Sequence, residues 1–503
     1  MKATNRSVKR QALKQEKKTK KLSEKKKRKL AMKEVASKIK QMLEERKEDL
    51  ISCVHLNSKD EPFGLNIDKL SSTYLEYFPT AYQEDSGFYF QYSIRGVWVK
   101  KSLLEITKHF KKIVNSLYPY FWKNSFSSEL EGILPLNCTA VEKFKKATNY
   151  INLLNGLFSL TTFELEPHRK EIFSTTQLNF SYDPDAKCPK FDRFLDDVFL
   201  GNERLKMRLS EAFGYGLTTL TEAQVFFIFY SPGSSGKSVA SRLFIRLAGG
   251  KEQVSTVALA DLSKKFQRSQ LWGKLANVST ENQQNGRQKF NTQALKAITS
   301  GDLIQLEFKG KNPFTDIITA KLFFSVNELP IPDDKTFAYM RRVVLIPFLA
   351  QFLDKPDKTK KEEKKRNPHM EKELARELPG LFNFSMEGLQ RLMKNKFQFT
   401  PSKVAQKVLA KYVSDINPIC NFVSETLEVN KKSEVTQDSL YAAYTTWARK
   451  NGERVDNKRS FLKDLRQNLN NAKIPFKERK SNSKRFFTGI ALKNPSNLSI
   501  DEI

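Results

Sequence analysis

The sequence predicts an α/β fold in which a buried strand, a glycine-rich turn and a helix follow one another near the middle of the chain. Residues 225–230 (VFFIFY) form a wholly apolar run rich in aromatic side chains, which is typical of a buried strand. The run stops at Ser-Pro-Gly-Ser-Ser-Gly-Lys-Ser, residues 231–238. Apolar residues at helical spacing follow, and Gly249 and Gly250 end that pattern.

This order of elements is the one that a phosphate-binding loop requires. Glycines allow backbone N–H groups to curl around phosphate oxygens, and the helix N-terminus adds its partial positive charge. Lys237 is then expected to reach the β- and γ-phosphates of ATP, and the Ser238 hydroxyl to ligate Mg²⁺. The residues predicted to contact the nucleotide are Pro232, Gly233, Ser234, Ser235, Gly236, Lys237, Ser238 and Val239. The alternative interpretation is an ordinary surface loop ahead of a helix.

Charge points to a polyanionic partner. The chain of 503 residues has a formal net charge of +31, and residues 1–48 alone hold 19 Lys or Arg against 6 Glu. Such an excess favours nucleic acid over a membrane surface. Residues 1–50 are therefore predicted to form a basic arm, solvated or transiently helical, which either clamps DNA or only solubilises the protein.

Composition excludes several other classes of protein. No apolar run approaches the roughly 20 residues that span a bilayer, and the N-terminus lacks the apolar core of a secretion signal. The four cysteines and four histidines are scattered without a Cys-x-x-Cys pair, so neither a zinc site nor a disulfide framework is predicted. We expect a soluble, intracellular protein without a membrane partner.

The region 51–222 is predicted to be a mixed, mainly helical module with short strands, whose aromatic residues lie in its core. Within it, residues 87–92 and 96–99 predict a hairpin, and residues 103–117 have helical spacing. Two amphipathic helices, 191–200 and 204–215, are predicted to lead the chain to the strand at residue 225.

Two later strands are predicted to end in polar side chains suited to nucleotide chemistry. Residues 275–281 predict a strand that ends in Glu281, a candidate general base and Mg²⁺ ligand. Residues 319–327 predict another that ends in Asn327, whose amide is placed to orient water near a γ-phosphate.

Basic residues follow at two further places. Residues 303–314 predict a hairpin with a Lys-Gly-Lys tip, whose alternative is an ordinary solvated turn. Arg341 and Arg342 directly precede a predicted strand, where an arginine can act on the nucleotide of a neighbouring subunit. The charged segment 354–366 is predicted to be a linker, followed by helices at 371–378 and 381–394.

The C-terminal residues from about 400 predict a small separate domain. Helices are expected at 402–416, 437–450 and 458–469, before two short strands around a Ser-Asn-Ser turn. This order suggests a winged helix, and the alternative is a helical cap with a solvated hairpin. The predicted phosphate-contacting wing consists of Lys477, Arg479, Lys480, Lys484 and Arg485.

Taken together, these motifs resemble those of the superfamily 3 helicases, and more narrowly the phage- and plasmid-type primase–helicases related to the poxvirus primase–helicase. Matching elements outside the central motifs are Gly96-Val97-Trp98, Asn155-Gly156, Tyr182-Asp183-Pro184, Cys188-Pro189, Gly214-Tyr215, Glu377-Leu378-Pro379-Gly380 and residues 441–447. The likeness covers about residues 85–490.

The resemblance implies an AAA+-like P-loop ATPase that forms a homo-oligomer, a hexameric ring, and moves along single-stranded DNA. By resemblance, Lys237 and Ser238 bind triphosphate and Mg²⁺, Glu281 activates water and Asn327 senses the γ-phosphate. Arg342 is expected to act in trans, with Arg341 as the fallback. Lys309 and Lys311 are expected to hold the DNA backbone.

The resemblance also sets the expected domain limits. These are a basic arm (1–50), a helicase-associated domain (51–222), the ATPase core (223–352), a linker with a helical segment (353–398) and a winged-helix-like, origin-DNA-binding domain (399–503). Residues 1–85 are too few for a primase and lack a carboxylate cluster, so primers would come from a separate primase partner.

The sequence departs from the family pattern at two places, because Ser231 replaces a glycine and Ser279-Thr280 stands where some relatives carry another acidic residue. Two other hypotheses therefore stay open. The first is a DNA-binding replication initiator with weak or no ATPase activity, which a negligible turnover with intact DNA binding would favour. The second is a small-molecule or nucleotide kinase, which stimulation of ATP hydrolysis by single-stranded DNA would exclude.

Overall fold

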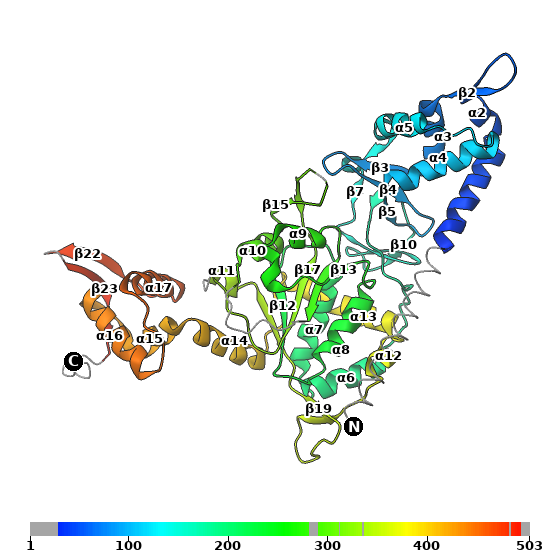
Figure 1. The fold of residues 1–503 in the computed structure, drawn as a ribbon. Coiled ribbons are helices and arrows are strands. Elements are labelled where there is room, and N and C mark those ends of the chain that lie inside the picture. Colours follow the sequence, from blue (N-terminus) through cyan, green and yellow to red (C-terminus); the bar gives the residue numbers. More distant parts are fainter. Residues whose placement is uncertain (1–28, 281–289, 311, 334–336, 482–483, 494–503) are drawn as a thin grey trace, which may run out of the picture. The chain divides into compact units, whose positions relative to one another are not determined.

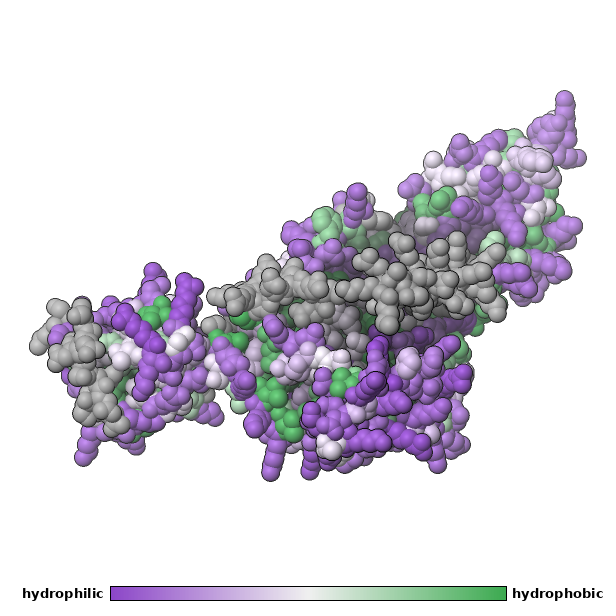
Figure 2. Space-filling model, turned by 60° about the horizontal axis from the view of Figure 1, so that its bottom comes forward, coloured by the Kyte–Doolittle hydropathy of each residue, from purple (hydrophilic) through white to green (hydrophobic). Residues whose placement is uncertain are grey.

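The computed structural model describes residues 29–280, 290–310, 312–333, 337–481 and 484–493 (Figure 1). The chain divides into two compact units, Met1–Ser181 with Gly310–Phe314, and Tyr182–Lys309 with Thr315–Ile503. Hydrophilic residues predominate on the face that Figure 2 shows. None of the helices within the described ranges is both long and apolar enough to cross a bilayer.

The first unit combines helices with small sheets, in keeping with the mixed, mainly helical module predicted from residue 51 onward. After a helix over residues 29–45, its elements are α2 (Lys47–Ile51), β1 (Val54–Leu56), β2 (Pro62–Leu65), α3 (Ile67–Tyr77), β3 (Thr80–Gln83), β4 (Phe88–Tyr92), β5 (Trp98–Lys101), α4 (Leu103–Leu117), α5 (Asn124–Asn137), β6 (Thr139–Ala140), η1 (Val141–Lys143), β7 (Lys145–Lys146), β8 (Tyr150–Leu153), β9 (Gly156–Ser159), β10 (Leu165–Glu166) and β11 (Ile172–Phe173). The sheet β5-β4-β3-β6 contains the predicted hairpin, in which β4 and β5 run antiparallel.

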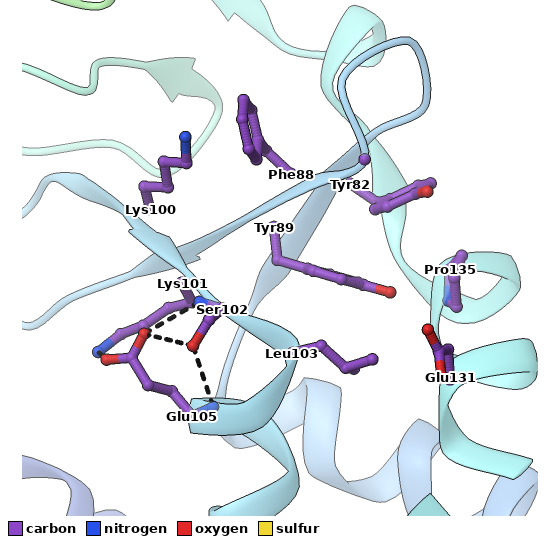
Figure 3. Close-up of a pocket in the computed structure, with 11 residues that line it drawn as sticks. Tyr82, Phe88, Tyr89, Lys100, Lys101, Ser102, Leu103, Glu105, Glu131 and Pro135 are labelled. Atoms are coloured by element: carbon purple, nitrogen blue, oxygen red, sulfur yellow. Dashed lines mark hydrogen bonds and ion pairs between the residues drawn. The ribbon is translucent and has the colours of Figure 1, made fainter. Parts of the chain in front are cut away.

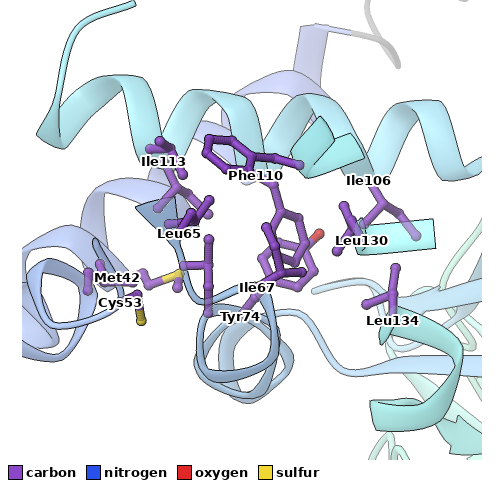
Figure 4. Packing of buried hydrophobic residues seen from close by; sticks show 14 of the residues in the cluster. Met42, Cys53, Leu65, Ile67, Tyr74, Ile106, Phe110, Ile113, Leu130 and Leu134 are labelled. Atoms are coloured by element: carbon purple, nitrogen blue, oxygen red, sulfur yellow. The ribbon is translucent and has the colours of Figure 1, made fainter. Parts of the chain in front are cut away.

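Helices α3, α4 and α5 enclose the core of this unit (Figure 4). Helix α4 follows the predicted bounds, and the Ser102 side chain begins it by accepting a bond from the Glu105 N–H, while the Glu105 carboxylate accepts from the Ser102 N–H. Ile39, Met42 and Leu50 of the predicted basic arm are at most 2% exposed and lie in the same core. The helix over residues 29–45 agrees with the helical form predicted for the arm, but part of it packs into a core and is not solvated. Residues 1–28 lie outside the described part of the chain.

A buried polar cluster accounts for the Gly96-Val97-Trp98 element. The Asn152 amide donates to the Gly96 carbonyl at 2.7 Å, and Nε2 of His168 lies 3.1 Å from Asn152 Oδ1. A Cβ atom at Gly96 would lie 2.1 Å from the His168 ring, so only glycine fits there. The indole of Trp98 donates to the Lys170 carbonyl at 3.1 Å. These residues hold the unit together through packing and hydrogen bonds.

The second unit is built on a five-stranded parallel sheet in the order β13-β14-β17-β12-β18. Its elements up to residue 416 are α6 (Pro189–Phe199), α7 (Glu203–Gly216), β12 (Phe226–Tyr230), α8 (Lys237–Leu247), β13 (Val254–Ser255), η2 (Leu259–Ser263), α9 (Lys265–Arg268), η3 (Ser269–Leu271), β14 (Ala276–Thr280), α10 (Gln293–Ser300), β15 (Leu303–Leu306), β16 (Phe314–Ile317), β17 (Lys321–Val326), α11 (Phe337–Met340), β18 (Val343–Pro347), β19 (Gln351–Leu353), β20 (Glu363–Lys365), α12 (Met370–Leu374), α13 (Leu378–Lys394) and α14 (Lys403–Ile416). The mixed α/β class predicted from the sequence is confirmed.

Strand β12 is apolar throughout because both faces of the sheet are covered. On one face, Phe323 of the neighbouring β17 stacks on Phe227 with ring centroids 4.5 Å apart, and Phe244 of α8 lies 4.4 Å from Phe323. On the other face, Phe226 contacts Tyr339 of α11 at 5.8 Å. Because successive side chains of a strand point to opposite faces of the sheet, Phe226 and Phe227 pack against the helices on opposite faces.

The segment predicted as a linker is part of this unit, which corrects that prediction. Strands β19 and β20 pair in parallel, and α13 packs closely along α7. Gly214 and Gly388 allow the close approach, since a Cβ atom at either would lie 2.2–2.3 Å from backbone atoms of the other helix. The fully buried Glu211 of α7 accepts a hydrogen bond from Arg391 of α13 at 2.8 Å, which locks the two helices together.

Lys321, at the start of β17, is buried and gives a pH-dependent contribution to stability. Its ammonium group lies 5.2 Å from the Tyr215 ring centroid, and burial lowers the pKa of Lys321 from 10.5 to about 7. Between these two values the unfolded chain binds more protons than the folded chain, so this residue makes the free energy of unfolding rise with pH. We expect Lys321→Met to be more stable than the unchanged protein at pH 7.5 and to lose that advantage towards pH 9.5, by up to about 1.4 kcal/mol per pH unit. Urea unfolding at both pH values measures this, and parallel pH curves for the two proteins would contradict it.

The chain beyond residue 417 forms a small helix-and-sheet fold with its own core. Its elements are α15 (Pro418–Thr426), β21 (Leu427–Thr436), α16 (Gln437–Lys450), α17 (Lys458–Asn471), β22 (Lys477–Ser481) and β23 (Lys484–Leu492), with strand order β21-β23-β22. Phe422, Tyr444, Phe461 and Phe487 are buried together in that core. The antiparallel pair around the Ser-Asn-Ser turn is confirmed, whereas α15 and β21 were not predicted.

Candidate functional site

The loop 231–236 lies at the carboxyl end of β12, where the order of the sheet reverses. From β12 the chain passes through α8 to β13 on one side of the sheet, whereas β18 pairs with β12 on its other side. Ligands of open α/β sheets bind at such a switch point, outside the carboxyl ends of the strands.

Backbone geometry and neighbouring side chains support this loop from behind. Gly236 has φ +88°, and a Cβ atom there would lie 3.2–3.3 Å from Val198 and Phe194 of α6. Ser234 has φ +49°, and its carbonyl accepts the Phe352 N–H at 2.7 Å. The sequence did not predict that Phe194, Val198 and Phe352 support the loop, because the pattern of apolar residues in a helix or strand does not show which loop they contact.

Lys237 is the first residue of α8 and is only 6% exposed. Its ammonium group donates to the Val326 carbonyl at 2.7 Å, to Asn327 Oδ1 at 2.8 Å and to the Ser231 carbonyl. The structure therefore brings together two predicted site residues that are 90 positions apart in the chain.

Ser231, which replaces the usual glycine, fits its position without strain. It is not among the residues with positive φ, so a side chain costs nothing there. Its hydroxyl accepts the Gly233 N–H at 3.3 Å, and its own N–H donates to the Val326 carbonyl at 3.4 Å. The serine thus stabilises the turn rather than disturbing it.

The loop presents several donors suited to an anion. Within the described ranges, the N–H groups of Ser234, Ser235 and Gly236 have no hydrogen-bond acceptor, and α8 has no acidic residue in its first turn. The Ser235 hydroxyl is likewise buried without a described partner, in a residue that is 2% exposed. Donors left unpaired beside a helix N-terminus are the arrangement that binds phosphate.

The predicted Mg²⁺ site is only partly described. Ser238 is exposed on the first turn of α8, so its hydroxyl is accessible for ligation. Strand β14 ends at the exposed Thr280, one residue before Glu281, which lies outside the described residues. No cluster of three or more His, Cys, Asp or Glu side chains suited to a metal occurs in the described part of the chain. Of the two predicted Mg²⁺ ligands, Ser238 and Glu281, the described residues thus include only Ser238.

The two arginines differ sharply in environment. Arg342 is 7% exposed and donates to Thr299 Oγ1 at 3.2 Å, Ser300 Oγ at 2.9 Å and the Ala338 carbonyl, all within its own unit. Burial, and next the charge of Arg341, lower the pKa of Arg342. Arg341 is exposed and donates to Gln224 Oε1 at 3.1 Å. The predicted role in trans does not fit Arg342, because its donors are occupied inside the subunit.

The predicted basic hairpin exists, since β15 and β16 form a two-stranded sheet. Lys309 follows β15 and is exposed, whereas Lys311 lies outside the described residues. In the C-terminal fold, Lys477, Lys480, Lys484 and Arg485 are exposed on β22 and β23. Arg479 differs from these, because it forms a bidentate pair with Glu434 at 2.6–3.0 Å and lies 5.2 Å from the Phe486 ring.

Three segments of the chain match known protein families. Residues 81–200 match the family described as D5 N terminal like, and residues 414–496 match the one described as Poxvirus D5 protein-like. Residues 229–342, which include the loop, match a family of unknown function, DUF5906. The two D5-type matches flank the loop-bearing segment, and they support the resemblance to the D5-type primase–helicases.

Solved structures of the NrS-1 C-terminal region are also similar to the chain. The A form apo structure and a further apo structure are each 11% identical to it, cover 84% of this chain and 98% of their own, and give a TM-score of 0.44. A TM-score below 0.5 at this identity assigns neither a fold nor an activity to the chain.

Proposed function

We propose that this protein is an ATP-dependent DNA helicase of the ring-forming superfamily 3 type, with an AAA+-like P-loop core. It would serve the replication of a phage, plasmid, viral or organellar replicon. One observation carries the proposal: Lys237 and Asn327 meet at 2.8 Å beside a loop of unpaired N–H donors, at the switch point of a parallel sheet.

The residues present fit a bound ATP–Mg²⁺. The N–H groups of Ser234 to Gly236 and the Ser235 hydroxyl would donate to the phosphate oxygens. Lys237 would exchange its present carbonyl acceptors for phosphate oxygens. Ser238 would ligate Mg²⁺, which when bound neutralises charge on the β- and γ-phosphates. Glu281 remains the proposed base for the attacking water, and Asn327 the group that orients it.

For the residue acting in trans we propose Arg341, in place of Arg342. An arginine can stabilise charge on a neighbour's nucleotide only when its guanidinium reaches the subunit surface. Arg341 meets this condition, and the buried Arg342 instead anchors the end of α10 to the start of β18. This assignment implies a homo-oligomer, for which we propose a hexameric ring.

Lys309 and Lys311 are proposed to hold single-stranded DNA through its phosphates. We further propose that the C-terminal fold is a winged helix that binds origin DNA, with Lys477, Lys480, Lys484 and Arg485 as its wing. Because Arg479 is already paired with Glu434, we expect it to support the wing rather than contact phosphate. A separate primase would supply primers.

Replacing both hairpin lysines is expected to weaken binding to single-stranded DNA and to reduce its dependence on salt. Each lost phosphate contact lowers the slope of log K against log salt by about 0.7 for single strands, so Lys309→Ala with Lys311→Ala should reduce it by about 1.4. Fluorescence anisotropy of a labelled oligonucleotide over a salt series measures this. An unchanged slope would show that the hairpin does not hold the strand.

The test of the whole proposal is ATP hydrolysis by the purified chain with and without single-stranded DNA. We expect hydrolysis that DNA stimulates, which would also exclude a kinase acting on small molecules. DNA binding with no hydrolysis above background would instead favour a replication initiator that binds nucleotide without turning it over.

A further inference from the structure

A pocket of about 540 Å³ opens in the first unit, between the strands β3, β4 and β5 and the helices α4 and α5 (Figure 3). Its volume falls within the roughly 300–1,000 Å³ that is usual for sites of small organic ligands. The pocket is lined by Tyr82, Gly87, Phe88, Tyr89, Lys100, Lys101, Ser102, Leu103, Glu105, Glu131 and Pro135. Aromatic and apolar side chains therefore form its walls, with a few charged groups among them.

Two of the charged groups are already engaged with each other and with the helix start. The Glu105 carboxylate accepts the Ser102 N–H at 2.9 Å and the Ser102 hydroxyl at 3.0 Å, as part of the cap of α4. Lys101 lies 3.6 Å from the same carboxylate. These side chains shape the pocket, but most of their hydrogen-bonding and charge-pairing capacity is already used within the protein.

Polar groups with unused capacity lie on the opposite side. Tyr89 is 6% exposed, yet within the described residues its hydroxyl has no hydrogen-bond partner. Figure 3 shows this hydroxyl pointing towards the side of the pocket that holds Glu131 and Pro135. Burial, together with the nearby Tyr82 and Glu131, raises the pKa of Tyr89, so the group stays a protonated donor. Glu131 is exposed and makes no described hydrogen bond or ion pair.

A cation and two rings complete the lining. The Lys100 ammonium group lies 3.0 Å from the centroid of the buried Phe88 ring, and the rings of Tyr82 and Tyr89 are 4.9 Å apart. The pocket thus combines flat apolar surfaces, a phenol donor and a carboxylate acceptor on one side with a positive charge on the other. A nucleotide has the matching parts, namely a planar base with polar edges and a phosphate.

We propose that this pocket takes one nucleotide of single-stranded DNA whose base carries an exocyclic amino group beside an unprotonated ring nitrogen on its Watson–Crick edge, as cytosine and adenine do. The amino group would donate to the Glu131 carboxylate, the Tyr89 hydroxyl would donate to the ring nitrogen beside that amino group, and Lys100 would lie near the phosphate. In the same position thymine places its O4 carbonyl against the Glu131 carboxylate and its N3–H against the Tyr89 hydroxyl, so Glu131 faces an acceptor instead of a donor. The inference rests on the proposed function only in taking DNA as the ligand, because it involves neither the loop 231–236 nor ATP.

The test is the affinity of the full chain for dC₁₂ and dT₁₂, measured by fluorescence anisotropy without nucleotide. We expect dC₁₂ to bind about tenfold more tightly, since a hydrogen bond to a charged group is worth about that factor or more. Glu131→Gln should remove the preference, because a carboxamide both accepts from cytosine and donates to thymine. Glu129→Gln, at an exposed position of the same helix outside the pocket, is the matched control and should keep the preference.

A second variant separates the pocket from the motor. Tyr89→Phe keeps the ring and its packing, and is expected to weaken dC₁₂ binding several-fold without changing the ATP hydrolysis rate at saturating DNA. Equal binding of both oligonucleotides by the unchanged protein, or a preference that survives Glu131→Gln, would overturn the proposal. Failure of the helicase proposal would show separately, as an absence of ATP hydrolysis.

Discussion

Arg341→Ala is expected to lower DNA-stimulated ATP turnover by about 10³-fold or more while leaving the folded subunit nearly as stable as before. The exposed guanidinium makes one described contact inside its own chain, the hydrogen bond to Gln224, so its loss should change stability by no more than about 0.5 kcal/mol. An arginine supplied by a neighbour is worth about 10³–10⁵ in rate, and this sets the expected loss. Steady-state hydrolysis at saturating DNA and a thermal melt together measure the two effects.

Arg342→Ala is the adjacent comparison and should behave in the opposite way. It removes donors to Thr299, Ser300 and Ala338 from a buried position, which should cost about 2 kcal/mol or more in stability. If Arg342→Ala instead abolished turnover with an unchanged melting temperature, Arg342 would be the residue that acts in trans, and the side chain would have to leave its buried position in the ring.

Lys237→Ala is the second change with a large expected effect, a loss of about 10²–10³-fold in ATP hydrolysis. That is the typical consequence of removing one preorganised donor from a charge-stabilising site. The change should also loosen the loop, because the carbonyls of Ser231 and Val326 lose their shared partner. Hydrolysis rates with and without DNA measure the loss, and DNA binding without nucleotide should remain.

The matched control for this change is Lys251→Ala, which removes an exposed lysine beyond the end of α8. It alters the net charge equally and should leave hydrolysis unaffected. Turnover by Lys237→Ala within a factor of two of the unchanged protein would mean that the loop does not bind the phosphates of a hydrolysed nucleotide.

The elements around the loop could be predicted because local pattern and tertiary burial agree there. The apolar run at 226–230 is buried because helices cover both faces of the sheet. The strand and the helix after it therefore lie at the residues that their hydrophobic patterns predicted. The meeting of Lys237 with Asn327 was also foreseeable, since residues that follow adjacent parallel strands share one edge of a sheet.

Other features depend on contacts that are distant in sequence. The segment 351–394 is rich in charge and was predicted to be partly a linker, but Glu377 accepts the N–H groups of Lys190 and Phe191 at the start of α6. The choice between Arg341 and Arg342 likewise follows from which side chain faces α10, and adjacent residues of one type give no sign of that in the sequence. The packing of the helix before residue 50 into a core was not predicted, because lysines and glutamates surround its few apolar residues.

The hydrogen bond from the Phe352 N–H to the Ser234 carbonyl has a consequence for how the protein can be divided. Phe352 lies at the limit expected for the ATPase core, and α13 further on packs along α7 beneath the same sheet. A fragment cut at residue 352 would therefore expose the glycine-lined face of α7 and remove both Arg391 and Thr400, the partners of the Glu211 carboxylate. The smallest piece expected to fold and hold its loop in shape runs to Thr400, whose N–H donates to Glu211 at 2.8 Å. The core and the helix after it therefore form a single structural block.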